Sequence, residues 1–260
     1  MKVLIALAVI VGSALAAPSL RIAGGQDASR DEFPYQISMQ WGLLGIWSHT
    51  CGGSIISEQW IVTAAHCITE TPSLGSYRIK AGILNLNDNV ASLQTISVAS
   101  YIVHEAYQGG VNPNDIALLR LSSSLSWSNS VQPINLPSAG AVPTGDSILS
   151  GWGSVSTTNV ASMPNTLQKA TLPLLDLNTC ASALVGLFGT SNPLASSNVC
   201  TGPLSGGISA CSGDSGGPLA QNGQLIGVVS WGVSPCGTFG APSVYVQTSS
   251  FIDWINRNTA

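Results

Sequence analysis

Three short segments of the chain carry residue types that could together perform nucleophilic catalysis. The first is Gly213-Asp214-Ser215-Gly216-Gly217, in which a serine stands between an acid and two glycines. A serine hydroxyl becomes a good nucleophile when a neighbouring base takes its proton, and glycine turns let backbone N–H groups face the same reacting atom. His66, in Thr63-Ala64-Ala65-His66-Cys67, offers such a base, and Asp115 is a lone acid that enters an apolar run.

The order of these residues along the chain separates two kinds of serine hydrolase. The segment around Ser215 also fits G-x-S-x-G, the nucleophile turn of α/β-hydrolases, in which the histidine follows the serine. All three histidines, His49, His66 and His104, precede Ser215, so that triad cannot be completed. The order His66, Asp115, Ser215 is the chymotrypsin-like one. The three segments, and nearly the whole mature chain, resemble the chymotrypsin-like serine protease family.

The resemblance implies a role for each of these residues. Ser215 is expected to be the nucleophile, His66 the general base and acid, and Asp115 the carboxylate that orients the imidazole. The backbone N–H groups of Gly213 and Ser215 are expected to form the oxyanion hole. We therefore expect a serine endopeptidase that hydrolyses peptide bonds through an acyl-enzyme. Its expected partners are polypeptide substrates and protein inhibitors.

The family binds the residue before the scissile bond in a pocket, and five positions match it: Ser209, Ser230, Trp231, Gly232 and Ser243. Ser209 matches the pocket base and is neutral, which argues against a preference for Lys or Arg. Gly232 leaves the mouth open for a large side chain, whereas Ser243 narrows the pocket slightly. We expect cleavage after large apolar or aromatic residues; the alternative is an elastase-like preference for small ones.

The first 21 residues have the pattern of targeting and activation segments, which are cleaved from the mature protein. A basic start, an apolar run over Val3–Val11 and the small residues of Ala14-Leu15-Ala16 predict a signal peptide over residues 1–16 and a secreted protein. The run is too short for a membrane span of about 18 residues. Residues 17–21 resemble an activation peptide ending at Arg21. A trypsin-like protease would cut there, and the resemblance implies that the freed Ile22 ammonium then pairs with Asp214.

The six cysteines fit a secreted protein, because an oxidising compartment would pair them. Six cysteines allow 15 pairings, and spacing alone does not choose among them. The resemblance implies Cys51 with Cys67, Cys180 with Cys200, and Cys211 with Cys236. No C-x-x-C pair exists, so a zinc site is disfavoured, and we expect no metal or cofactor. The 8 basic residues against 12 acidic ones disfavour nucleic acid and anionic membranes as partners.

Short alternating apolar runs, broken by Gly, Pro, Asn and Ser, predict an all-β fold without a βαβ rhythm. The clearest runs are Gln36–Met39, Ser54–Ile56, Trp60–Val62, Arg78–Ala81, Gln94–Val98, Leu225–Trp231 and Ser243–Val246. The resemblance supplies two six-stranded antiparallel β-barrels with a C-terminal helix. Within a peptidase domain over residues 22–260, we expect barrels over about 22–133 and 134–247, and the helix over 248–258.

The sequence is compatible with three functions. The first is a digestive endopeptidase made as a zymogen, expected to be a monomer. The second is a defence or signalling protease, and the third is a catalytically inactive homologue that only binds. Retention of His66, Asp115 and Ser215 together with the activation junction favours an active enzyme. His49 is expected to be either a structural residue or, as in some relatives, a contact of Asp214 before activation. The insertion over Gly42–Trp47 is expected to extend recognition on the leaving-group side.

Overall fold

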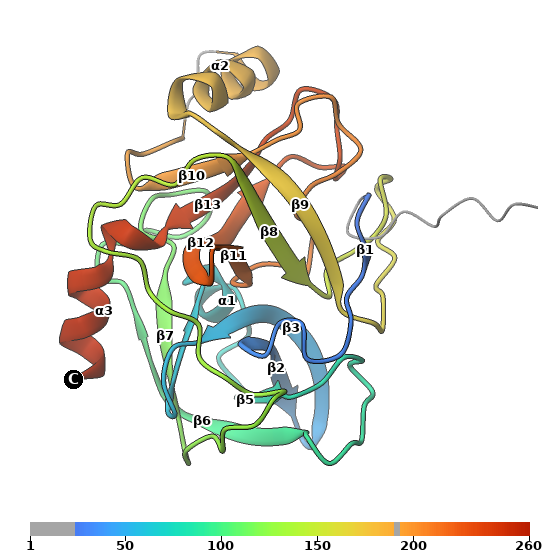
Figure 1. Ribbon diagram of the computed structural model, residues 1–260, viewed down its shortest axis with the longest axis vertical. Helices are drawn as coiled ribbons and strands as arrows, with labels where there is room; N and C mark the ends of the chain where they lie inside the picture. Colours follow the sequence, from blue (N-terminus) through green and yellow to red (C-terminus); the bar gives the residue numbers. More distant parts are fainter. Residues whose placement is uncertain (1–23, 190–192) are drawn as a thin grey trace, which may run out of the picture.

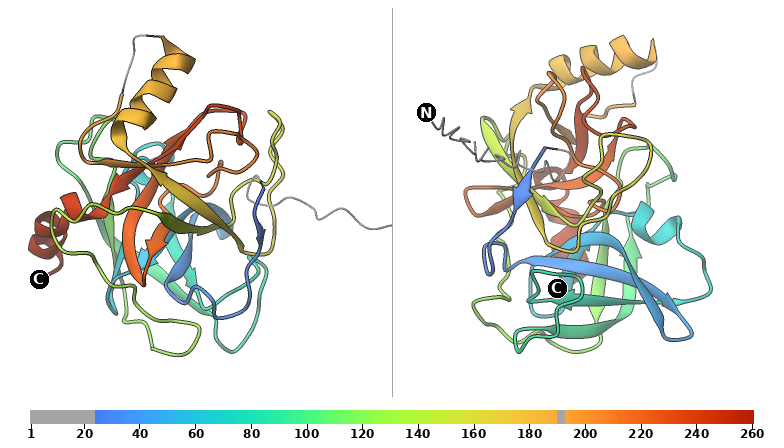
Figure 2. Two further views of the ribbon diagram at one scale, coloured as in Figure 1. Left: turned by 45° about the horizontal axis from the view of Figure 1, so that its top comes forward. Right: turned by 90° about the vertical axis from the view of Figure 1, so that its right-hand side faces the viewer.

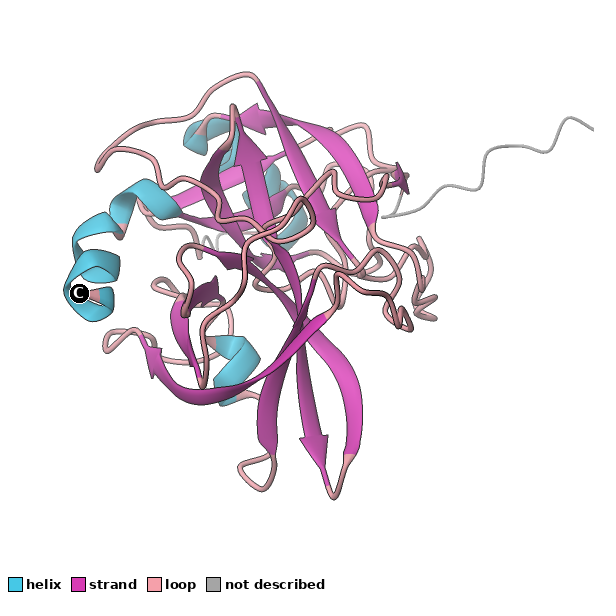
Figure 3. Ribbon diagram, turned by 60° about the horizontal axis from the view of Figure 1, so that its bottom comes forward, coloured by secondary structure: helices cyan, strands magenta, loops and turns pink. Residues whose placement is uncertain are grey.

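Two antiparallel β-barrels, packed one against the other, make up the body of the protein in the computed structural model (Figure 1). The structure describes residues 24–189 and 193–260. The expected signal peptide, the activation peptide and the junction at Arg21 and Ile22 lie outside these residues. Strands dominate the described chain and helices are few (Figure 3). Within those ranges, no helix has the length and apolar character to cross a lipid bilayer.

The first barrel is a closed sheet of six strands in the order β2, β3, β4, β7, β6 and β5. Their bounds are β2 Gln36–Leu43, β3 Ile46–Ile55, β4 Trp60–Thr63, β5 Ser76–Ala81, β6 Gln94–Val103 and β7 Ala117–Leu121. Alternate side chains point inward and fill the barrel, among them the fully buried Ile37, Met39 and Ile79. The short helix α1, His66–Thr69, follows β4 directly. The edge-free barrel thus provides a rigid support for His66.

The second barrel closes through the pairing of β8 with β9, and its order is β9, β10, β13, β12, β11 and β8. Its strands are β8 Asp146–Gly151, β9 Gln168–Leu175, β10 Asn198–Thr201, β11 Pro218–Gln221, β12 Gln224–Gly232 and β13 Ser243–Gln247. A two-residue strand, β1 (Gln26–Asp27), pairs with the outer side of β9. Helix α2 (Leu177–Phe188) projects from this barrel (Figure 2).

The C-terminal segment ties the two barrels together. A 3-10 turn, η1 (Thr248–Ser250), follows β13 and leads into helix α3 (Ile252–Thr259). Phe251, Trp254 and Ile255 are buried in the same apolar cluster as the core of the first barrel. The helix therefore leaves the second barrel and packs on the first, which fixes how the two halves dock.

The structure confirms the expected all-β fold with two barrels and a terminal helix. The predicted helix begins as a 3-10 turn and runs one residue further than expected, to Thr259. Helix α2 was not predicted. Its N-cap is Asp176, whose carboxylate accepts the Thr179 N–H at 2.9 Å, and the helix buries mainly Cys180 and Leu184.

Three disulfides join the cysteines in the pairs that the resemblance implies. Cys51 is bonded to Cys67, Cys180 to Cys200, and Cys211 to Cys236. The first bond links β3 to α1, and the second links α2 to β10. The third closes the loop that leads to Ser215 onto the segment after β12. Two of the three bonds therefore restrain segments that carry candidate catalytic residues.

Candidate active site

The candidate catalytic residues come from both barrels and meet where the barrels face each other. His66 is the first residue of α1, Asp115 lies just before β7, and Ser215 lies in the loop before β11. Hydrogen bonds cross between the barrels here. The Gly52 N–H donates to the Ser215 carbonyl at 2.8 Å, and Ser230 Oγ donates to Asp115 Oδ2 at 2.6 Å. Gly52 also packs so closely on Gly217 that a Cβ would lie 2.8 Å from the Gly217 Cα.

Asp115 holds His66 through two hydrogen bonds. The His66 backbone N–H donates to Oδ1 at 2.8 Å, and His66 Nδ1 lies 2.7 Å from Oδ2. Because an ionised carboxylate can only accept, Nδ1 carries the proton, and Nε2 of the neutral ring is left to act as a base. Burial lowers the pKa of His66, but the hydrogen bond and charge of Asp115 outweigh it, so the pKa lies above its usual value.

Ser215 lies at the same site, although no hydrogen bond joins it to His66 in the described part of the chain. The lack of a hydrogen bond between Ser215 and His66 is compatible with catalysis, because catalytic hydrogen bonds often tighten only when substrate binds.

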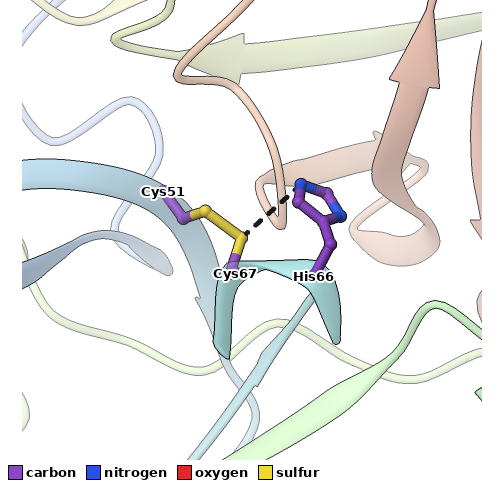
Figure 4. A group of neighbouring side chains, drawn as sticks. All are labelled: Cys51, His66 and Cys67. Carbon is purple, nitrogen blue, oxygen red and sulfur yellow. Dashed lines mark hydrogen bonds between the residues drawn. A yellow bond between two sulfur atoms is a disulfide. The ribbon is translucent and has the colours of Figure 1, made fainter. Parts of the chain in front are cut away.

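His66 Nε2 lies 4.0 Å from Cys67 Sγ (Figure 4). The Cys51, His66 and Cys67 side chains are close enough together to resemble a metal-ligand set. The two sulfurs are bonded to each other, however, and a disulfide lacks the thiolates that bind zinc.

The loop before β11 leaves alternate N–H groups free. The Asp214 N–H donates to the Cys211 carbonyl and the Gly216 N–H to the Val229 carbonyl, at 2.9 and 2.8 Å. Neither the Gly213 nor the Ser215 N–H has a partner within residues 24–189 and 193–260. Gly213 has a φ of +98°, which favours glycine. Two free donors beside the Ser215 hydroxyl are the arrangement that an oxyanion hole needs.

His49 supports this loop from the first barrel. Its Nε2 lies 3.0 Å from the Gly213 carbonyl oxygen, and its Nδ1 lies 2.8 Å from Ser38 Oγ. The ring also contacts Trp152 edge-on. Burial lowers the pKa of His49, and the bond to Gly213 opposes this. A neutral ring with its proton on Nε2 would donate to Gly213 and accept from Ser38. His49 thus contacts the residue before Asp214 and not the carboxylate itself.

Asp214 is a fully buried carboxylate without a cationic partner among the residues that the structure describes. The Gly153 N–H donates to Oδ1 at 2.8 Å and the Cys211 N–H to Oδ2 at 3.0 Å. Burial raises the pKa of Asp214 to about 6, although both hydrogen bonds lower it. Gly151 and Gly153 flank the carboxylate so closely that a Cβ on either would collide with it. These two glycines, in Gly151-Trp152-Gly153, escaped the sequence interpretation.

A cavity of about 240 Å³ opens beside Ser215. Its walls are Ala210, Cys211, Ser212, Ser215, Val229, Ser230, Trp231, Gly232, Val233, Ser234 and Cys236, none of them charged. A Cβ on Gly232 would meet nothing within 4 Å, so this side of the cavity is open. Ser209 and Ser243 are buried behind the wall. The first accepts from the Gly237 N–H at 2.8 Å and the second from the Ala210 N–H at 3.1 Å.

Comparison with known proteins shows that the chain is similar in sequence to trypsins and a related serine protease. The family model described as Trypsin matches residues 22–255. Trypsin-1 of Astacus astacus is 42% identical over 245 residues, covering 91% of this chain and 99% of the relative. Trypsin of Phaedon cochleariae is 39% identical, covering 93% and 90%. Serine protease 1 of Rattus norvegicus is 37% identical, covering 100% and 99%.

Proposed function

The chain belongs to the trypsin family of serine endopeptidases, and from this premise we propose that His66, Asp115 and Ser215 are its catalytic triad. The observation that carries the proposal is the pair of hydrogen bonds from His66 to Asp115, which leaves Nε2 as the available base. The Gly213 and Ser215 N–H groups form the oxyanion hole, since the loop leaves both without an internal partner in the described chain.

These residues perform peptide hydrolysis in two steps. Ser215 Oγ attacks the scissile carbonyl carbon while His66 Nε2 takes the hydroxyl proton, and the new oxyanion accepts from Gly213 and Ser215. Nε2 then gives the proton to the leaving amine, the C–N bond breaks, and an ester on Ser215 remains. Water attacks this ester with the same base, which releases the carboxylic acid and restores the hydroxyl. Asp115 stabilises the imidazolium in both steps.

The cavity beside Ser215 is proposed to hold the side chain before the scissile bond. Several relatives are named trypsins. This chain, however, has neutral Ser209 at the matching base position and no carboxylate in the cavity wall, so a substrate guanidinium would be buried without a counter-charge. We propose a preference for Phe, Tyr, Trp, Leu or Met. An elastase-like preference for small apolar residues is the second candidate.

Activation is proposed to follow a cut after Arg21 by a trypsin-like protease. The buried Asp214 carboxylate supports this, because an unpaired buried charge is unfavourable and an ammonium partner would stabilise it. At the start of the described residues, Gly24 packs on Gly207 and Ile208, in the segment that leads along the chain to Asp214. The sequence pattern of residues 1–16 supports secretion. A digestive role is proposed, with a defence or signalling protease as the alternative.

The test is hydrolysis of four chromogenic peptides that differ only in the last residue, Phe, Leu, Ala or Arg. The protein is cut with trypsin, and the trypsin is then removed; the Ser215→Ala variant is treated identically as the control. We expect hydrolysis fastest after Phe or Leu and absent in the variant. Fastest hydrolysis after Arg would overturn the proposed specificity, and equal activity in Ser215→Ala would overturn the proposed triad.

A further inference from the structure

A second cavity, of about 510 Å³, lies at one end of the second barrel. The ends of β9 and β13 and the start of β10 form it, together with a strap of residues 140–145 that leads to β8. Its apolar wall consists of Val142, Pro143, Leu174, Leu175, Leu177 and Val199. Gln247 lines this cavity, whereas Ser243, at the other end of β13, pairs with Gly232 of the cavity beside Ser215. The two cavities are therefore roughly 14 Å apart along β13 and share no lining residue.

The strap is anchored at both ends, and its side chains leave the cavity open. The Gly140 N–H donates to the Ser249 carbonyl at 3.0 Å, and the Leu174 N–H donates to the Gly145 carbonyl at 2.8 Å. Between these anchors Val142 is 77% exposed, so its side chain does not close the space. Backbone hydrogen bonds thus hold the walls in place. A cavity that is already formed loses little conformational entropy when a ligand enters it.

Gln247 contributes a polar atom that lacks a partner. The residue is only 9% exposed, and its Nε2 donates to the Ala141 carbonyl at 3.1 Å and to Ser249 Oγ at 2.8 Å. Ser249 Oγ donates its own hydrogen to the Ala141 carbonyl at 2.6 Å. Because a carbonyl only accepts, the amide nitrogen must face Ala141, and both of its hydrogens are used. No donor among the residues that the structure describes reaches Gln247 Oε1, which keeps access to the cavity. The cavity therefore offers a fixed acceptor.

The charge around the cavity narrows the class of ligand. Asp176 is the one charged residue of the lining; it is exposed, and its two oxygens accept from the Thr179 N–H at 2.9 Å and from Thr179 Oγ1 at 2.6 Å. Its negative charge disfavours an anion such as a fatty-acid carboxylate. A cation would lose its hydration against the apolar wall. Small-molecule sites usually have volumes of roughly 300–1,000 Å³ and combine apolar walls with a few polar groups that fix orientation. The walls, the acceptor and the volume together fit an uncharged apolar molecule with a hydrogen-bond donor.

We propose that this cavity binds a small, uncharged, apolar molecule whose N–H or O–H group donates to Gln247 Oε1. The apolar body of the ligand displaces water from Val142, Leu174 and Leu175. The hydrogen bond orients the ligand and gives the Gln247 oxygen the partner that it lacks within the described chain. A molecule of the same shape without a donor binds more weakly. The site does not depend on the proposed endopeptidase function, since none of its residues lines the cavity beside Ser215.

The test measures the binding of indole and benzothiophene by isothermal titration calorimetry, with the uncut chain in a Ser215→Ala background. The two probes have nearly the same shape, but benzothiophene has sulfur in place of the indole N–H. We expect indole to bind several-fold more tightly. Gln247→Met, which removes the acceptor, is expected to lower the affinity for indole to that for benzothiophene. Val142→Asp is expected to weaken both probes, whereas the matched control Val160→Asp, also at a 77% exposed valine, is expected to change neither.

The change Gly232→Val separates this site from the cavity beside Ser215, which has room for indole as well. A Cβ on Gly232 meets nothing within 4 Å, so the fold tolerates the valine, which narrows the mouth of that cavity. We expect Gly232→Val to leave the preference for indole over benzothiophene intact. Binding that Gly232→Val abolishes and Gln247→Met preserves would overturn the proposal. Equal affinity of the parent for both probes, or no binding of either, would also overturn it. If Gln247→Met does not fold, the comparison of the two probes on the parent and on Val142→Asp still decides.

Discussion

The change Asp214→Asn is expected to affect the uncut and the cut protein in opposite directions. The carboxylate is fully buried, and burial raises its pKa from 3.8 to about 6. The folded state therefore binds the proton more tightly than the unfolded state does. The unfolding free energy accordingly falls as pH rises through the window from about 4 to 6, and the cost is fully present above it. A shift of about two pKa units corresponds to about 3 kcal/mol.

Asparagine removes this cost but loses part of the hydrogen bonding, because its NH₂ group cannot accept from the Gly153 or Cys211 N–H. The loss of one hydrogen bond offsets about 1 kcal/mol of the stability gained by removing the buried charge. At pH 7.5 the uncut Asp214→Asn protein is therefore expected to be about 2 kcal/mol more stable than the uncut parent. In the cut protein the Ile22 ammonium is proposed to pair with Asp214, and removing one partner of that pair is expected to destabilise the protein by about 3–5 kcal/mol.

Urea unfolding measures both effects in a Ser215→Ala background, which prevents self-digestion. The proteins are compared before and after cleavage behind Arg21, at pH 4 and pH 7.5. The exposed Asp146, changed to asparagine, serves as the matched control. If Asp214→Asn changes the unfolding free energy of uncut and cut protein by the same amount at pH 7.5, the ammonium does not pair with Asp214. The difference in unfolding free energy between uncut Asp214→Asn and the uncut parent is expected to be larger at pH 7.5 than at pH 4. If this difference is the same at both pH values, the Asp214 carboxylate is not the pH-sensitive group.

Three further predictions concern catalysis. Asp115→Asn is expected to lower kcat about ten-thousand-fold with little change in KM, because the amide no longer selects the His66 tautomer with a free Nε2; a loss below tenfold contradicts this. The acid limb of kcat/KM is expected to have its midpoint above 6.5, since only neutral His66 accepts a proton and Asp115 raises its pKa; a midpoint at or below 6.5 in a pH series contradicts it. His49→Leu is expected to lower kcat but not raise KM, because the Gly213 carbonyl loses its partner, and His49→Gln, which keeps a donor near Nε2, is expected to restore most of the rate. Equal rates in the two variants would show that the hydrogen bond does not matter.

Local sequence patterns predicted an all-β fold, and the family resemblance implied the two barrels and the three candidate catalytic segments. Alternating runs such as Gln36–Met39 and Ser243–Val246 lie in strands because their apolar faces fill a barrel. Short motifs single out Ser215 and His66 as candidates, since each stands in a distinctive stretch of sequence. Helix α2 was missed because only Cys180 and Leu184 of its twelve residues are buried, which leaves a weak helical pattern.

Contacts between distant segments could not be predicted from local patterns. The Gly153 N–H reaches Asp214 across 61 positions in the sequence. His49 reaches Gly213 across 164 positions. Neither glycine has a side chain that marks its role, and each contact depends on the way in which the two barrels dock. The Gly151 and Gly153 pair beside Asp214 became recognisable only because a Cβ there would collide with the carboxylate.

Covalent labelling of Ser215 tests most directly whether an imidazole of the first barrel activates a hydroxyl of the second. The activated protein is treated with a phosphonate ester that reacts with activated serines, and the product is mapped by mass spectrometry. We expect a single adduct on Ser215, and a reaction rate roughly a thousandfold lower in His66→Ala. An adduct on another serine, or an equal rate in His66→Ala, would contradict the proposed mechanism.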